Sequence, residues 1–152
     1  MDGEVELVLK VLFLDVDGVL NTTRAGRPMS LSKGCLRRLE NVVEETNCHL
    51  VLSSSWRKYD DAFAHLNRVL RYRQMIIISS TPVIHSASRG TEIAVWLNTH
   101  RAVERYAIVD DDSDMLHEQL PNFFQTDPDH GLSDTIAYRI IQHLKLPLPT
   151  PF

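Results

Sequence analysis

The sequence predicts an α/β fold in which a mostly parallel five-stranded sheet lies between two layers of helices. Short apolar runs alternate with segments of helical periodicity along the chain, and parallel strands need such crossover helices. The runs are apolar at nearly every position, as expected of strands that are buried on both faces. Composition agrees, because 43% hydrophobic and 24% charged residues are ordinary for a globular domain.

The predicted strands are the apolar runs at residues 7–14, 50–52, 75–78, 106–109 and 123–125. Segments with an apolar stripe lie between them and predict helices over 32–45, 60–70, 92–98 and 133–144. Ser32 and Ser133 are predicted N-caps, and Asp60 or Asp61 would cap the second helix. These elements correspond to a Rossmann-like three-layer sandwich over residues 1–146, followed by a Pro-rich tail at 147–152.

Composition also limits the classes of function. A net charge of −4 does not suggest general electrostatic binding to nucleic acid, although it leaves room for a local basic patch. Cys35 and Cys48 are too few for a disulfide scaffold and are interpreted as buried thiols. The most apolar run, residues 5–20, contains four charged side chains, so we expect no membrane span and a cytoplasmic location.

Acidic and hydroxyl residues follow the predicted strands, at the points where the strands end. They are Asp15, Asp17 and Gly18 after the first strand, Ser53–Ser55 after the second, Ser79–Thr81 after the third and Asp110–Asp112 after the fourth. Parallel α/β sheets bind ligands at the carboxyl ends of their strands. The sequence therefore predicts that these polar groups gather at one edge of the sheet.

Grouped carboxylates repel one another unless a cation lies between them, and oxygen ligands favour Mg²⁺. A Mg²⁺ site with hydroxyl groups and a nearby cation suits a phosphoryl group. Asp15 and Asp17 lie two residues apart, so at strand spacing their side chains share one side of the chain. One could attack phosphorus while the other handles the leaving-group proton, and Gly18 would allow a sharp turn towards the substrate.

Each motif also has an ordinary structural interpretation. Asp15–Gly18 could be a strand-ending turn, Ser53–Ser55 a helix cap, and Asp110–Asp112 a solvated turn or helix start. The three motifs in this order, each after an apolar strand, favour the functional interpretation.

Together these residues resemble the haloacid dehalogenase-like (HAD) hydrolase superfamily. The first motif reads VLFLDVDGVL at residues 11–20, the second LVLS at 50–53, and the fourth AIVDDD at 107–112. Within the superfamily the chain looks closest to the small HAD domains associated with RNA-repair proteins. That likeness rests on SSSWR at 53–57, on Glu92, Ile93, Trp96 and Leu97, and on DDDS at 110–113.

The resemblance implies a role for each matching residue. Asp15 would be the nucleophile and a metal ligand, and Asp17 the general acid and then the general base, with its main-chain carbonyl on Mg²⁺. Ser53 would bind the transferring phosphoryl oxygens, while Asp110 and Asp111 would hold Mg²⁺ directly or through water, assisted by Asp114. Gly18, Ser54 and Arg57 are assigned to substrate binding. The third-motif cation, commonly Lys, is assigned to Arg89, 21 residues before Asp110, with Arg57 and Lys58 as rivals.

HAD enzymes differ mainly in their inserted cap domains. The segments 21–31 and 79–89 are too short to fold as caps, so the resemblance implies a capless enzyme with an open site. Such a site suits nucleic-acid ends, nucleotides or phosphoproteins. A group of basic residues with two tyrosines among them would either bind a polynucleotide or form the solvent-exposed face of a helix. These residues are Arg57, Lys58, Arg68, Arg71 and Arg73, with Tyr59 and Tyr72. Trp56 is expected to pack under its loop.

The sequence thus predicts a Mg²⁺-dependent phosphatase that forms a covalent aspartyl-phosphate on Asp15 and acts on phosphate monoesters, nucleic-acid ends or nucleotides. The alternatives are a metal-dependent nuclease, which would use the carboxylates only as metal ligands, and a catalytically weak HAD fold that binds nucleic acid or protein. A phosphoacceptor receiver domain fits less well, because the second strand ends in Ser and the last strand lacks Lys.

Overall fold

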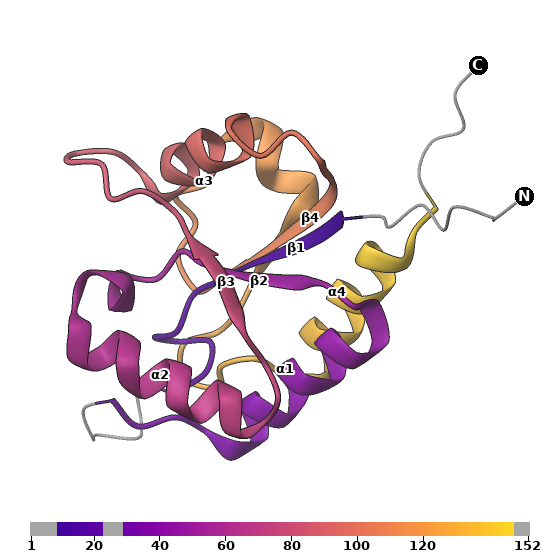
Figure 1. Ribbon diagram of the computed structural model, residues 1–152. Helices are drawn as coiled ribbons and strands as arrows, with labels where there is room; N and C mark the ends of the chain where they lie inside the picture. The colour runs from indigo at the N-terminus through magenta and orange to yellow at the C-terminus, as the bar shows by residue number, and fades with distance from the viewer. Residues whose placement is uncertain (1–8, 23–28, 148–152) are drawn as a thin grey trace, which may run out of the picture.

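The computed structural model describes residues 9–22 and 29–147, which form an α/β fold (Figure 1). The strands are β1 (Leu9–Leu14), β2 (His49–Leu52), β3 (Ile77–Ser80), β4 (Val103–Asp110) and β5 (Phe123–Gln125). The helices are α1 (Lys33–Thr46), α2 (Asp60–Tyr72), α3 (Arg89–Asn98) and α4 (Asp134–Lys145), with 3₁₀ helices η1 (Ser55–Lys58) and η2 (His117–Asn122). The sheet has the order β3-β2-β1-β4-β5, and every pair is parallel. The predicted fold class is therefore confirmed.

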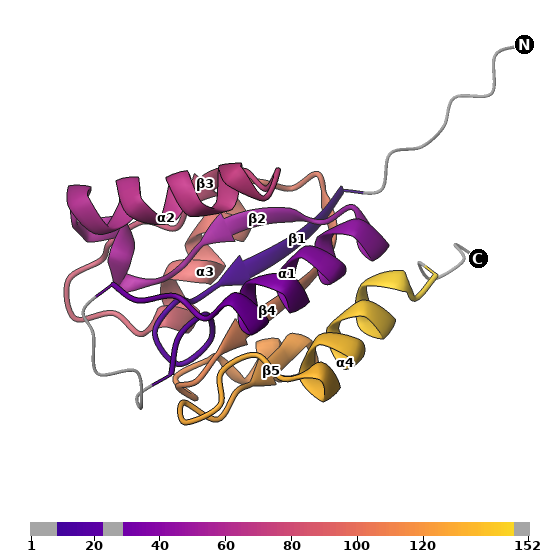
Figure 2. The same cartoon turned by 90° about the horizontal axis from the view of Figure 1, so that it is seen from below.

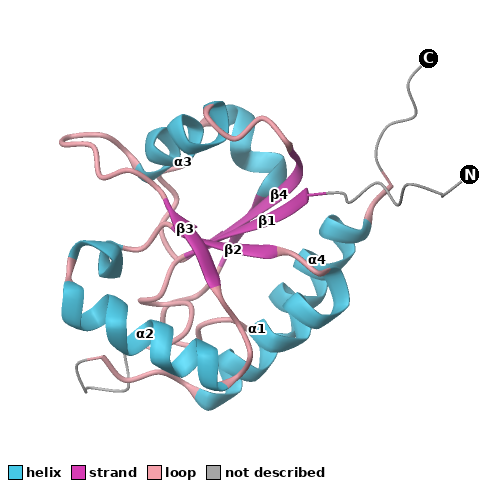
Figure 3. Cartoon of the chain, in the orientation of Figure 1, coloured by secondary structure: helices cyan, strands magenta, loops and turns pink. Residues whose placement is uncertain are grey.

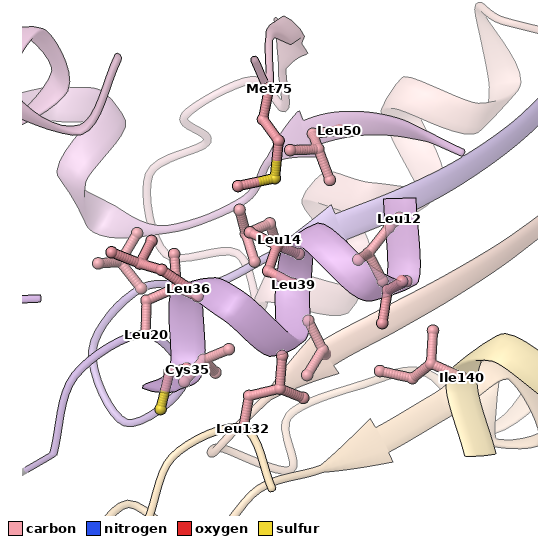
Figure 4. Packing of buried hydrophobic residues seen from close by; sticks show 14 of the residues in the cluster. Leu12, Leu14, Leu20, Cys35, Leu36, Leu39, Leu50, Met75, Leu132 and Ile140 are labelled. Atoms are coloured by element: carbon pink, nitrogen blue, oxygen red, sulfur yellow. The ribbon is translucent and has the colours of Figure 1, made fainter. Parts of the chain in front are cut away.

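Alternate residues of each strand point to opposite helical layers, as the pleat of a strand requires. Leu12 and Leu14 of β1 belong to the larger core cluster, which α1, α2 and α4 cover. Figure 4 shows Leu14 close to Leu36 and Leu39 of α1. Figure 2, seen from below, shows these helices on one side of the sheet. The carboxyl-terminal halves of the central strands are thus buried on both faces, which explains their apolar sequences at residues 11–14 and 107–109.

The other face of the sheet carries the smaller core cluster beneath α3. Phe13 of β1 makes an edge-to-face contact with Trp96 of α3, with 5.4 Å between ring centroids. The indole N–H of Trp96 donates to the Ser79 hydroxyl at 2.9 Å. Figure 3 shows α3 on the opposite side of the sheet from α1 and α2. These contacts fix α3 over β1 and β3, with its N-terminus towards the carboxyl ends of the strands.

Several predicted boundaries were wrong. The third strand was expected at 75–78 but begins at Ile77, because Met75 donates its N–H to the Leu70 carbonyl and so ends α2. Ser79 and Ser80 consequently lie inside β3, and Thr81 follows it. Neither Asp60 nor Asp61 caps α2; the N-cap is Tyr59, and both carboxylates lie in the first turn, where they complement the helix dipole.

Other local expectations agree with the structure. Ser32 and Ser133 cap α1 and α4 through their hydroxyl groups, and Ser88 caps α3, which begins three residues before the predicted Glu92. Cys35, Cys48 and Trp56 are buried. The described parts of 21–31 and 79–89 form no inserted domain, in agreement with a capless fold. Residues 7, 8, 23–28 and 148–152, on which parts of the predicted first strand, flap and tail fall, lie outside the described residues.

No helix in the described ranges combines the length and apolar character needed to cross a membrane.

Candidate active site

Four polar residues lie side by side at the carboxyl edge of the sheet; three follow the last residue of their strand, and the fourth is the last residue of β4. The register aligns Leu14 with Leu52 and Val109, and Leu52 with Ser80. The next residues are Asp15, Ser53, Asp110 and Thr81. Backbone hydrogen bonds extend the ladder, from Asp15 to Val109, from Ser53 to Leu14 and from Thr81 to Leu52, at 3.0–3.2 Å.

These residues share the side-chain parity of Phe13, Val51 and Ile108, which face α3. A row of two hydroxyl groups and two carboxylates thus lies under the N-terminus of α3. The predicted gathering of polar groups at one edge is observed for the first, second and fourth motifs.

Three carboxylates of the row and the following loop form a compact cluster. One oxygen each from Asp15, Asp110 and Asp111 lies within 4.8 Å of the other two. Asp15 and Asp110 are buried, and Asp111 is half-buried. The donor set is entirely oxygen, as hard divalent cations such as Mg²⁺ prefer. This cluster is therefore able to hold a metal ion.

Gly18 makes room for this cluster. It has a φ of +78°, and a Cβ built on it would collide with the Asp111 side chain. The Gly18 carbonyl also accepts a 2.7 Å hydrogen bond from the Thr126 hydroxyl, which joins the first-motif turn to the end of β5. A residue with a side chain would meet both a steric and a conformational barrier here.

Arg89, at the first turn of α3, reaches into the carboxylate cluster. Its Nη1 lies 3.1 Å from an oxygen of Asp15 and 2.7 Å from an oxygen of Asp110. Burial alone would lower the pKa of this guanidinium, but the charges of Asp15 and Asp110 outweigh burial and raise it. Arg89 offsets one of the three carboxylate charges, and the remaining two match a divalent cation.

The start of α3 is fastened to the loop after β4, and this positions Arg89. The main-chain N–H groups of Arg89 and Gly90 donate to the carboxylate and the carbonyl of Asp114, at 3.0 and 3.2 Å. Buried Gln119 donates to the Gly90 carbonyl at 2.8 Å. A Cβ on Gly90 would run into Leu116 and Gln119, so the helix can approach this closely only with glycine.

Asp15 has a strongly perturbed environment. Burial, and then the negative charge of Asp110, raise the pKa of Asp15 to about 8, although Arg89 opposes the shift. A carboxylate at this position is thus poorly stabilised by the protein alone, so the site favours an additional positive charge.

Two buried hydroxyl groups of the row have no hydrogen-bond partner among the described residues. They are the Oγ of Ser53 and the Oγ1 of Thr81. Leaving a buried hydroxyl unsatisfied costs about 1–3 kcal/mol. Hydroxyl groups of this kind beside a carboxylate cluster are suited to bind a ligand, because they can donate hydrogen bonds to its oxygens.

Asp17 is held apart from the cluster by two donors. The indole N–H of Trp56 donates to one carboxylate oxygen at 3.1 Å, and the amide of Asn21 donates to the other at 2.9 Å. Asn21 also accepts the Gly18 N–H at 2.9 Å, so it closes the first-motif turn. Trp56 is only 6% exposed, so it packs under its loop and donates its hydrogen bond to Asp17 from that buried position.

Arg57 is occupied entirely within the protein. Its five N–H donors meet the carbonyls of Ser53, Ser54, Thr81 and Pro82 and the carboxylate of Glu92, at 2.8–3.3 Å. Its side chain is 3% exposed. The Ser54 hydroxyl accepts the Trp56 N–H and caps η1. Lys58 is exposed and lines a hollow that Arg89 also lines.

Sequence reasoning missed three of these contacts. Asn21, three residues after Gly18, is a local side-chain-to-backbone pattern that the sequence could have indicated. The pairing of Trp56 with Asp17 and of Arg57 with Glu92 joins distant segments, and no sequence spacing signals it.

Comparison with known families agrees with this geometry. Residues 11–137 match the family described as "HAD domain in Swiss Army Knife RNA repair proteins". No curated protein and no solved structure matches the chain. The matched range runs from within β1 to within α4, so it includes the carboxylate cluster, Arg89 and the hydroxyl row. The chain belongs to the family of HAD domains found in Swiss Army Knife RNA repair proteins.

Proposed function

We propose that the chain is a Mg²⁺-dependent phosphatase that hydrolyses phosphate monoesters, on nucleic-acid ends or nucleotides, through an aspartyl-phosphate on Asp15. The proposal rests on one observation, the cluster of Asp15, Asp110 and Asp111, two of which are buried, with Arg89 between two of its carboxylates. The family match adds support for a substrate related to nucleic acid.

In this proposal an Asp15 oxygen attacks phosphorus, and the bond from phosphorus to the leaving oxygen breaks. Asp17 gives a proton to that oxygen and later takes one from the water that attacks the aspartyl-phosphate, which restores Asp15. Arg89 and the unpartnered Ser53 hydroxyl would stabilise the phosphoryl oxygens. Asp110, Asp111, Asp15 and the Asp17 carbonyl would hold Mg²⁺, which when bound would offset the charge of the carboxylates and the phosphoryl group.

Contacts inside the protein suggest structural roles for two residues that the sequence assigned to substrate. The five donors of Arg57 are all satisfied, and the Ser54 hydroxyl caps η1. Arg89 therefore has better support than Arg57 as the third-motif cation, because it alone of the two contacts Asp15. Gly18 supports the site by leaving space for Asp111.

The proposal is tested by steady-state hydrolysis of a generic aryl phosphate with and without Mg²⁺, in wild type and Asp15→Asn. Turnover that requires Mg²⁺ and disappears in Asp15→Asn is expected. Asp112→Asn is the matched control, because Asp112 is an exposed neighbour outside the cluster. An Asp15→Asn enzyme that stays active, or cleavage of internal phosphodiesters with the same residues, would favour the nuclease alternative.

A further inference from the structure

A groove between α1 and α2 is lined by cations and an exposed aromatic ring. It has a volume of about 650 Å³, and its walls include Met29, Lys33, His65, Arg68, Tyr72 and Arg73. No acidic residue is among the described residues that line it, although the chain has a net charge of −4. The remaining lining is aliphatic or hydroxyl. The groove therefore combines apolar walls with positive charge.

The α2 wall follows from helical spacing. His65, Arg68 and Tyr72 stand at positions i, i+3 and i+7 of α2, so they form one stripe, while Leu66 and Leu70 point into the core. Tyr72 is 90% exposed. A ring this exposed contributes little to the fold, and its faces are free to stack.

The charge of the groove is largely uncompensated. Arg73 pairs with Glu40 at 3.2 Å, but Lys33 and Arg68 form no ion pair within the described ranges, and both are exposed. The hollow between α1 and α4 provides a contrast. It is similar in volume, about 590 Å³, and also contains an exposed tyrosine, Tyr138, yet three acidic residues line it.

One end of the groove lies near the candidate active site. The Ser32 N–H donates to the Leu20 carbonyl at 2.7 Å, which ties the segment before α1 to the first-motif turn. His65 lies against Trp56, with ring centroids 6.4 Å apart, and Trp56 in turn donates to Asp17. Figures 1 and 2 show α1 and α2 on the same face of the sheet. The His65 end of the groove thus lies nearest the turn that carries Asp15 and Asp17, whereas Tyr72, the last residue of α2, lies towards the start of β3.

We propose that this α1–α2 groove binds a single-stranded polynucleotide, with Lys33 and Arg68 at backbone phosphates and a base stacked on Tyr72. Spaced cations around an exposed aromatic ring are the chemistry that single strands require. An acidic peptide would use the cations but leave the ring unexplained. The inference concerns binding and does not depend on the proposed reaction at Asp15.

The test is fluorescence anisotropy of the full chain with a labelled single-stranded oligouridine over a range of salt concentrations. Tyr72→Ala should raise Kd about tenfold and leave the salt dependence unchanged, because stacking on the ring carries no charge. Tyr72→Phe should bind like wild type. Lys33→Ala/Arg68→Ala should make the slope of log K against log salt shallower by about 1.4, the value for two phosphate contacts on a single strand.

The matched control is Arg37→Ala/Tyr138→Ala, which removes a cation of α1 and an exposed tyrosine from the α1–α4 hollow. It should bind as tightly as wild type. Absence of binding to wild type at low salt, or equal losses in the control and groove variants, would overturn the proposal. Equal competition by an acidic peptide would also overturn it and would indicate a protein partner instead. Aryl phosphate hydrolysis, measured in parallel, separates this outcome from failure of the proposed enzyme activity.

Discussion

Replacement of Arg57 by Ala should destabilise the protein strongly, because the guanidinium joins three separate parts of the chain. Without the guanidinium, the Glu92 carboxylate, whose side chain is 9% exposed, keeps only the Ile84 N–H as a described partner. Four main-chain carbonyls also each lose a hydrogen-bond donor. Removing one partner of a buried ion pair costs about 3–5 kcal/mol. For a domain of this length that corresponds to a fall in Tm of roughly 10 °C.

Urea unfolding followed by circular dichroism measures this free energy. Arg71→Ala is the control, because this exposed arginine on α2 should change stability by less than about 0.5 kcal/mol. Arg57→Met/Glu92→Leu should recover part of the loss, since no isolated charge remains buried. If Arg57→Ala instead stays within about 1 kcal/mol of wild type and raises KM, the guanidinium serves the substrate and our structural reasoning fails.

Three further predictions follow from the site and the core. Ser53→Ala should not lower Tm and should raise it slightly, because it removes a buried hydroxyl that has no partner, but should lower kcat/KM for an aryl phosphate roughly 10- to 100-fold; equal activity would remove Ser53 from the site. Gly18→Ala should cost at least about 1 kcal/mol and abolish the rise in Tm that we expect Mg²⁺ to produce in wild type, since its Cβ displaces Asp111; an intact Mg²⁺ response would contradict this. Burial lowers the pKa of His143 below its ordinary 6.5, so the unfolded chain binds its proton more readily and the free energy of unfolding should fall as pH drops through 6.5. Urea titrations at about pH 5 and 7.5 should show a smaller difference in His143→Gln than in wild type.

The sequence predicted the fold well where a strand is buried on both faces. β1, β2 and β4 carry apolar runs at residues 11–14, 50–52 and 107–109, and the row of Asp15, Ser53 and Asp110 follows from their parallel register. β3 was misplaced because it is an edge strand with Ile78 exposed, so its apolar pattern carries less information about burial.

The charged residues of the candidate site could be predicted from the sequence, but the contacts that hold them in place could not. Carboxylates at strand ends can be read from spacing, and Arg89 could be assigned by the resemblance. The hydrogen bond from Trp56 to Asp17 spans 39 residues, and the fit of Asp111 against Gly18 depends on how two loops meet. Such contacts are set by tertiary packing, and local sequence carries no signal for them.

The most direct test of the central claim is a search for phosphorylated Asp15 after rapid acid quench. Wild type mixed with a phosphate monoester and Mg²⁺ is digested, and the peptide that contains residues 11–20 is examined by mass spectrometry. We expect this peptide to gain one phosphoryl group, to lose it with hydroxylamine, and to remain unmodified in Asp15→Asn. Active turnover without any modified peptide in the pre-steady state would contradict the aspartyl-phosphate and favour direct attack by water at a metal site.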